Sequence, residues 1–133
     1  MDGMCGIGVD IESIGRFQGL RRPKNALFFE KIYTSAELAY CFSKDDPAPH
    51  LAARFAAKEA VIKALYSLGK KTIPFTSIEI FRTEDGLPSV KIHHSSYAAL
   101  QSKVSLSHCE DKAIAFALLQ ENLPARKGRG KRG

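Results

Sequence analysis

One carboxylate stands out on the longest helical segment of the sequence. Apolar side chains recur at helical spacing from about residue 50 to residue 68. Glu59 falls on the apolar stripe of this segment, and Lys63 lies one turn further along. A carboxylate there is costly to bury unless a cation, hydrogen bonds or a metal satisfy it. The plain structural alternative is an i,i+4 pair with Lys63, worth only about 0.2–0.5 kcal/mol. The stripe is formed by Ala52, Phe55, Ile62 and Tyr66.

A second carboxylate, Asp10, ends a predicted strand over residues 4–11. Its side chain shares one face of that strand with Gly6 and Gly8, while the other face is apolar. Glycines weaken a strand, so these two predict that another backbone or a ligand approaches the face closely. Two carboxylates brought together repel unless a hard cation lies between them. Magnesium prefers one or two carboxylates plus phosphates and water, so Asp10 and Glu59 suit a nucleotide-type ligand.

Two cations of the long helix could contact the phosphates of such a ligand. Arg54 and Lys63 lie on different faces of the helix, and both residue types bind phosphate. The aromatic residues of the chain are interpreted more simply as core. They include Phe55, Tyr66, Phe75, Phe81 and Phe116.

The elements that must position these residues follow from periodicity and turn chemistry. Thr34 and Glu37 have the spacing of a capping box that starts a helix ending near Phe42. Residues 45–49 are rich in Asp and Pro and predict a loop. The order of elements indicates an α+β fold with a mostly antiparallel sheet around one long helix. The remaining predicted segments are short helices over 13–20, 25–32 and 95–102, and strands over 76–82, 89–93, 104–107 and 112–119.

The strong basicity of the chain belongs to its end. The 133 residues carry a formal charge of +6, but five basic residues lie within residues 126–133. Residues 1–125 hold fifteen basic and fourteen acidic residues, a net charge of +1. We therefore expect one domain over residues 1–124, followed by a disordered basic tail over 125–133. One group of basic residues remains in the body, formed by Arg16, Arg21, Arg22 and Lys24.

The chain has the composition of a cytoplasmic protein. No apolar run approaches the ~18 residues that span a bilayer, and the first residues do not resemble a secretory signal. Its three cysteines, Cys5, Cys41 and Cys109, are odd in number and lack metal-type spacing. A reducing compartment fits them best, as idle thiols.

Three segments together resemble one enzyme family, the small bacterial holo-acyl-carrier-protein synthases of the phosphopantetheinyl transferase superfamily. Gly6-Ile7-Gly8-Val9-Asp10-Ile11, followed by Arg16, is similar to the opening motif of that family. Arg54-Phe55-Ala56-Ala57-Lys58-Glu59-Ala60-Val61-Ile62-Lys63-Ala64 resembles its central motif, the most specific of the three. Val104-Ser105-Leu106-Ser107-His108 resembles its C-terminal Ser-His strand, and Asp85-Gly86-Leu87-Pro88 a turn of the family. The resemblance covers residues from about 4 to 120.

The resemblance implies a reaction and a set of ligands. The family transfers the 4′-phosphopantetheine arm of coenzyme A to a serine of an apo acyl carrier protein, using Mg²⁺. Asp10 and Glu59 correspond to the ligands of the magnesium that holds the pyrophosphate. Lys63 corresponds to a residue beside the phosphates, and Arg54 to one near the 3′-phosphate of the nucleotide.

The resemblance also implies the borders of the coenzyme site and its partners. Pro88, Ser107 and His108 correspond to edges of the coenzyme cleft. The group formed by Arg16, Arg21, Arg22 and Lys24 falls where the family docks the acidic helix of the carrier. The family is typically homotrimeric, with each active site shared between neighbouring subunits. The proton acceptor for the serine stays open among a metal-bound water, Glu59 and His108. A histidine at the end of a strand is also often a hydrogen-bonded structural residue.

Two other function classes remain. A nucleic-acid-binding module would use the basic tail, although the near-neutral body argues against it. A catalytically silent coenzyme A binder would keep the ligand site without transfer.

Overall fold

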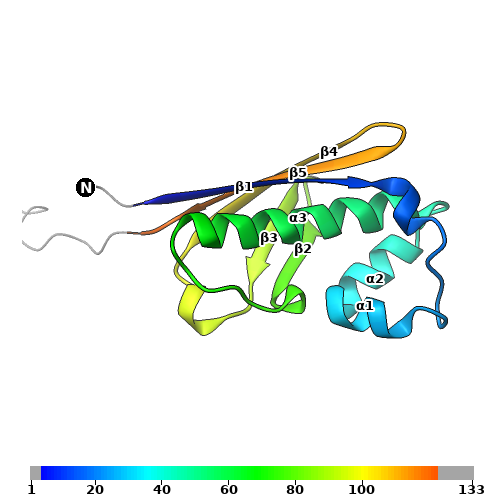
Figure 1. The fold of residues 1–133 in the computed structure, drawn as a ribbon, viewed down its shortest axis with the longest axis horizontal. Coiled ribbons are helices and arrows are strands. Elements are labelled where there is room, and N and C mark those ends of the chain that lie inside the picture. Colours follow the sequence, from blue (N-terminus) through cyan, green and yellow to red (C-terminus); the bar gives the residue numbers. More distant parts are fainter. Residues whose placement is uncertain (1–3, 123–133) are drawn as a thin grey trace, which may run out of the picture.

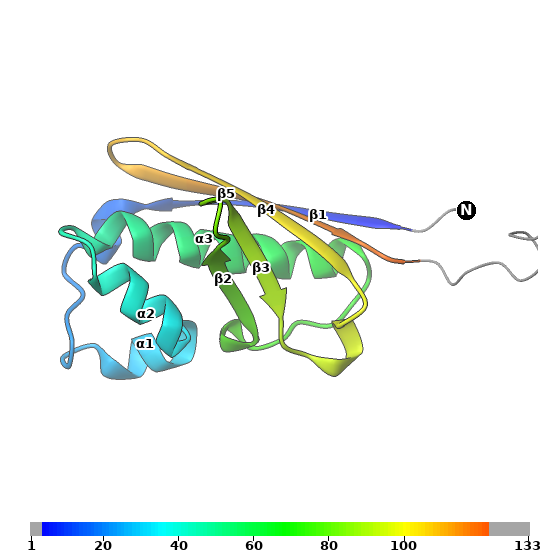
Figure 2. The same ribbon diagram turned by 180° about the vertical axis from the view of Figure 1, so that it is seen from behind.

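The fold was obtained as a computed structural model that describes residues 4–122. One long helix, α3 (Pro47–Ser67), runs through its middle. A three-stranded sheet covers one side of α3, and the other sides are covered by a two-stranded hairpin and two shorter helices (Figure 1). The view from behind shows the same layers (Figure 2). This is the predicted α+β arrangement, with antiparallel pairing throughout.

The three-stranded sheet has the order β1-β5-β4. Its strands are β1 (Cys5–Ser13), β4 (Gln101–His108) and β5 (Lys112–Gln120). The hairpin consists of β2 (Ile78–Arg82) and β3 (Pro88–Ile92), and its turn contains Gly86 at φ 82°, a value that favours glycine. The predicted tail over 125–133 lies outside the described residues.

The inner face of the sheet is made of very small side chains where it meets α3. Gly6 and Gly8 face the helix from β1, and Ala115 and Ala117 face it from β5. A Cβ added at Gly8 would lie 1.9 Å from the carbonyl oxygen of Ala60. The backbones of β1 and α3 therefore touch directly, which confirms the close approach predicted from the two glycines.

The outer face of the same sheet is apolar and uncovered. Because side chains alternate along a strand, the residues between Gly6, Gly8 and Asp10 in β1 point away from the helix, as do the alternate residues of β5. Their exposed fractions in one chain are 56% for Ile7, 51% for Val9, 58% for Ile11, 40% for Ile114 and 44% for Phe116. The core interpretation was therefore wrong for Phe116, and also for Tyr66 and Phe81, which are 60% and 38% exposed.

Two short helices, α1 (Ala26–Ile32) and α2 (Ser35–Phe42), pack at one end of α3. The predicted capping box of Thr34 and Glu37 is confirmed at the start of α2. Glu37 is buried, accepts the Ile80 N–H, and forms an ion pair with the fully buried Lys58. This contact fastens α2 to both α3 and β2.

Three predicted segments differ from the structure. The loop predicted over residues 45–49 is confirmed for Asp45 and Asp46 and was wrong for residues 47–49. Asp46 caps α3, and Pro47 occupies its first helical position, where the N–H that proline lacks would have no helical partner. The helix predicted over 13–20 is only a 3₁₀ turn, η1 (Ile14–Phe17). The helix predicted over 95–102 is a 3₁₀ turn, η3 (Ser95–Tyr97), before β4 begins at Gln101. A further 3₁₀ turn, η2 (Phe75–Ser77), precedes β2.

Within residues 4–122 no helix has the length and apolarity needed to cross a membrane.

Candidate active site

The structure brings Asp10 of β1 to Lys63 of α3. The Lys63 ammonium donates to the Asp10 carboxylate, with 3.3 Å from Nζ to Oδ1, and to the Val9 carbonyl at 3.0 Å. The other carboxylate oxygen of Asp10, Oδ2, is buried and has no hydrogen-bond partner. An acceptor buried without a partner is costly, so this oxygen is well placed to bind a cation.

Glu59 lies one helical turn before Lys63 and belongs to the same site. Burial raises the pKa of Glu59, and the nearby Asp10 carboxylate raises it further, while Lys63 and Arg16 oppose the rise. The predicted pair of carboxylates is therefore assembled at the contact between β1 and α3. Within residues 4–122 no three His, Cys, Asp or Glu side chains are grouped as a metal site. A pair suits Mg²⁺, which completes its shell with phosphate oxygens and water.

Glu12 is a third carboxylate beside this pair, and it was not among the predicted site residues. We call Asp10, Glu12 and Glu59 the acidic edge. It lies two residues after Asp10 on the same face of β1 and is only 8% exposed. The pKa of Glu12 is raised to about 7. Burial is the largest cause, a hydrogen bond with Asp10 and the charges of Asp10 and Glu59 add to it, and Arg16 opposes it. Arg16 of η1 forms an ion pair with the Glu12 carboxylate. The i,i+2 spacing after Asp10 was a usable signal for this residue.

A second group of cations gathers around Tyr40 of α2. The Arg54 guanidinium stacks on the Tyr40 ring at 4.1 Å from its centroid, and the Lys44 ammonium lies 4.7 Å from the same centroid. Nε of Arg82 donates to the Tyr40 hydroxyl at 3.0 Å. Among the described residues, none of these three cations forms an ion pair. We call Tyr40, Lys44, Arg54 and Arg82 the basic cluster.

The basic cluster is electrostatically strong because its positive charge is uncompensated. Arg54 is 2% exposed, and its Nε is buried without a hydrogen-bond partner. Burial lowers the pKa of the adjacent His50, and Arg54, Lys44, Arg82 and His108 lower it further. A cation of this burial without a counter-ion favours an anionic ligand nearby. Of the cluster, the sequence identified only Arg54, since its members come from three segments: the end of α2 with the residues after it, α3, and β2.

The residues expected at the cleft edges separate in the structure. His108 and Ser107 are neighbours on β4, so their side chains point to opposite faces of the sheet. His108 lies in one cross-strand row with Ala113 and Glu12, on the side of α3. Ser107 pairs with Ile114 on the outer face. Pro88 starts β3 and lines a cavity of about 500 Å³ between the hairpin and β4.

The predicted docking residues lie on the surface around η1 and the segment that follows it. Arg16, Arg21, Arg22 and Lys24 are all exposed. The Arg21 guanidinium bonds to the carbonyls of Gln18 and Leu20, and the Arg22 guanidinium lies over the Phe42 ring at 4.6 Å.

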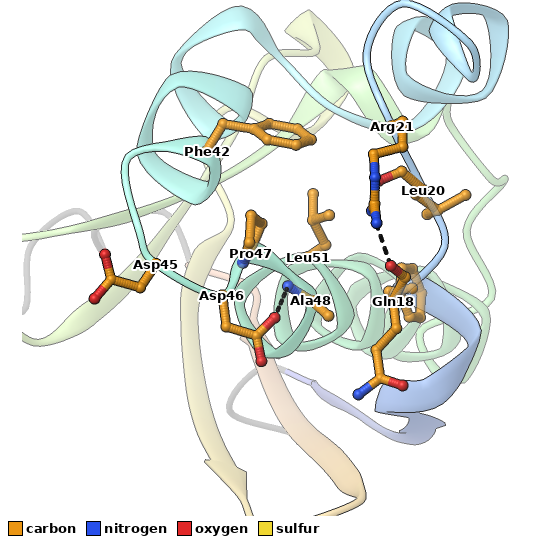
Figure 3. A pocket seen from close by; sticks show the side chains of 10 residues that line it. Gln18, Leu20, Arg21, Phe42, Asp45, Asp46, Pro47, Ala48 and Leu51 are labelled. Carbon is orange, nitrogen blue, oxygen red and sulfur yellow. Dashed lines mark hydrogen bonds between the residues drawn. The ribbon is translucent and has the colours of Figure 1, made fainter.

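A cavity of about 380 Å³ opens beside these residues (Figure 3). Apolar side chains form much of its wall, while Arg21 stands on one side and Asp45 and Asp46 on the other. The Asp46 carboxylate is engaged in capping α3 through the Ala48 N–H. The apolar lining comes from Phe17, Leu20, Phe42, Pro47, Ala48 and Leu51.

Comparison with known proteins gives one consistent result. The model of the 4′-phosphopantetheinyl transferase superfamily matches residues 6–117. The chain is 44% identical over 117 residues to a holo-[acyl-carrier-protein] synthase of Chlorobaculum parvum, covering 86% of this chain and 97% of that protein. It is 43% identical over 120 residues to the synthase of Chlamydia muridarum, covering 88% and 95% of the two chains.

Solved structures agree with this result. The fold is similar to that of a Chronobacterium ammoniagenes ACPS–CoA complex, with a TM-score of 0.74 and 28% identity over 90% of this chain and 99% of the other. It is also similar to a Helicobacter pylori holo-[acyl-carrier-protein] synthase in complex with coenzyme A, with a TM-score of 0.72 and 28% identity, covering 85% and 98% of the two chains.

Proposed function

This chain belongs to the 4′-phosphopantetheinyl transferase superfamily, and from this we propose that it acts as a holo-acyl-carrier-protein synthase. It transfers the 4′-phosphopantetheine arm of coenzyme A to a serine of an apo acyl carrier protein and releases adenosine 3′,5′-bisphosphate. The reaction supports fatty-acid or polyketide synthesis. The observation that carries the proposal is the acidic pair of Asp10 and Glu59 beside Lys63, with a buried carboxylate oxygen left unpartnered.

Mg²⁺ fits the acidic pair. Asp10 and Glu59 would hold it, since both offer carboxylate oxygens at the contact between β1 and α3. When bound, Mg²⁺ neutralises the charge that develops on the leaving phosphate. Lys63 adds a second positive centre: its side chain is 52% exposed, so its ammonium is accessible to a phosphate oxygen. With the cation held by the two carboxylates, Lys63 would bind and orient the pyrophosphate, and positioning supplies much of the rate.

Of the two side chains considered as proton acceptors, Glu59 is better placed than His108. Its raised pKa reflects a carboxylate that gains from binding a proton or a cation. His108 is separated from Glu12 by the whole of β5, so its backbone lies roughly 10 Å from β1. Within one chain, we therefore assign His108 to the phosphate-binding side, near His50, and not to proton transfer at Asp10.

The basic cluster suits the 3′-phosphate of coenzyme A. Lys44 and Arg82 are exposed and can contact a phosphate dianion, and the buried Arg54 adds positive charge from behind the Tyr40 ring. Arg54 was expected near the 3′-phosphate. Because it is buried, it would act on the phosphate through its charge and its stack on Tyr40. Pro88, which pairs with Arg82, and His108 would border the same ligand, whereas Ser107 faces the other side of the sheet.

We further infer a homotrimer in which neighbouring chains share each active site. Arg54 and Lys63 are nine residues apart on α3, so they project in roughly opposite directions. One coenzyme molecule contacts both the basic cluster around Arg54 and the acidic pair with Lys63 more easily when the two groups come from different chains. The apolar outer face of the β1-β5-β4 sheet supplies a surface for such an assembly, because exposed patches of this kind mark interaction sites.

The carrier would dock on the exposed cations Arg16, Arg21, Arg22 and Lys24, which match an acidic partner. The neighbouring cavity of Figure 3 offers an apolar wall for a side chain of the docked helix. The free thiols of Cys5, Cys41 and Cys109 fit a reaction in the reducing cytoplasm.

The transfer itself can be measured by mass spectrometry of an apo carrier protein incubated with coenzyme A, Mg²⁺ and this protein. We expect the carrier to gain the mass of one phosphopantetheine arm. Asp10→Asn and Glu59→Gln should each lower the rate by about 10²–10³-fold, because each removes part of the charge that holds the cation. Glu84→Gln, in the exposed hairpin turn, is the matched control and should keep the wild-type rate. No mass gain with fatty-acid and polyketide carriers alike would contradict the proposal.

Dephospho-coenzyme A, which lacks the 3′-phosphate, tests the basic cluster. Tyr40→Leu removes the ring on which Arg54 and Lys44 stack, and it should raise KM for coenzyme A by on the order of tenfold. Tyr40→Phe removes only the hydroxyl that Arg82 contacts, so its effect should be about threefold. KM for dephospho-coenzyme A should stay unchanged in both variants. An equal rise for both substrates would show that Tyr40 has only a structural role.

Light scattering tests the assembly. We expect a mass near three times the 14.6 kDa of one chain. Phe116→Asp places a charge on the apolar outer face and should reduce the mass towards that of one chain. Leu27→Asp is the control, because Leu27 is 78% exposed on α1, away from that face. A wild-type mass of one chain would contradict the trimer.

A further inference from the structure

Arg16 stands between the surface and the acidic edge. Its guanidinium pairs with Glu12, while its side chain is 58% exposed and therefore open to a partner. The Phe17 and Phe55 rings hold the guanidinium from the sides, at 5.5 and 5.6 Å from their centroids. One cation thus reaches a buried carboxylate and the solvent at the same time.

Glu12 connects Arg16 to the cation site. It lies two residues after Asp10 on the inner face of β1, about 7 Å along the strand, and its side chain is buried at the contact with α3. In the free protein Lys63 neutralises Asp10 and Arg16 neutralises Glu12. Each carboxylate of β1 therefore carries its own side-chain counter-ion. Both counter-ions are exposed enough to be drawn to other anions, Lys63 to phosphate and Arg16 to a carboxylate.

We propose that the Glu12–Arg16 pair couples carrier docking to cation binding, so that a docked acidic carrier raises the affinity of the Asp10–Glu59 site for a divalent cation. The proposal rests on the proposed function, because it requires the carrier to dock on Arg16. A carboxylate of the carrier that binds the Arg16 guanidinium withdraws positive charge from Glu12. The potential at Asp10 and Glu59 then becomes more negative, and a cation binds there more tightly.

Coupling of this kind is reciprocal: the cation must raise the affinity for the carrier by the same factor. The pair would thus favour a complete complex over partly assembled ones. Glu12 acts here as a positioning residue, through its charge and through Arg16, and it does not need to contact the cation.

Direct cation binding measures the coupling without turnover. Mn²⁺, which takes the same oxygen ligands as Mg²⁺, is titrated into the full-length protein at pH 8, and free Mn²⁺ is followed by electron paramagnetic resonance. The titration is made with and without a saturating apo carrier whose acceptor serine is replaced by alanine. That replacement prevents the hydroxyl from binding the cation itself. We expect the carrier to lower the Kd for Mn²⁺ by about fivefold.

Two variants assign the effect to the pair. Glu12→Gln should leave Kd the same with and without the carrier. Arg16→Gln, a change at an exposed side chain, should lower Kd for Mn²⁺ even without the carrier, because it removes the counter-ion of Glu12. Glu84→Gln is the control and should keep the fivefold ratio.

Carrier binding with no change in Kd, or an unchanged ratio in Glu12→Gln, would overturn the coupling while leaving the proposed function standing. Failure of the carrier to bind would overturn the docking itself, and the coupling with it.

Discussion

The direct contact between the backbones of β1 and α3 is the constraint on which the rest of the molecule depends. It exists because Gly6 and Gly8 have no side chains, so the strand rests on the carbonyl groups of Ala64 and Ala60. Any larger residue at Gly8 would place its Cβ within 2 Å of the helix backbone. Alanines at positions 113, 115 and 117 continue the same thin layer across β5.

The close approach is what makes the acidic edge possible. Two residues beyond Gly8 on the same face, Asp10 lies near enough to the helix to meet Lys63 and Glu59. With ordinary apolar side chains between strand and helix, the layers would lie about 10 Å apart and these groups could not meet. The same alternation sends the large apolar residues of β1 and β5 outward, where they leave the exposed surface that we assign to the assembly. One pattern of small and large residues therefore sets both the cation site and the interface.

The sequence allowed the prediction of contacts between residues close in the chain, and of residues whose type does not suit their place in a strand or on an apolar helix face. The glycine face of β1, the capping box of Thr34 and Glu37, and Glu59 on an apolar stripe are of this kind. The start of α3 was predicted about three residues late, because the prolines at 47 and 49 favour a loop by composition but are also tolerated in the first turn of a helix. The basic cluster could not be predicted, because Arg54 and Arg82 reach Tyr40 only through tertiary packing.

Glu37 illustrates the limit well. Its role in the capping box follows from a spacing of three residues, but its contacts with Ile80 and Lys58 join segments about 20 to 40 residues away. The pair of Arg16 and Glu12 is an intermediate case between a contact predictable from local spacing and one formed only by tertiary packing. Their i,i+4 spacing is visible in the sequence, yet the pair spans the end of a strand and a 3₁₀ turn, where that spacing alone predicts no contact.

Urea unfolding of Gly8→Ala beside Gly19→Ala tests the central claim most directly. The contact predicts that Gly8→Ala lowers the free energy of unfolding by about 3 kcal/mol or more, because the new methyl group meets helix backbone that cannot move aside. A Cβ at Gly19 has nothing within 4 Å, so Gly19→Ala should change stability by less than about 0.5 kcal/mol. Equal stabilities for the two variants would contradict the account, since strand and helix would then not meet through Gly8.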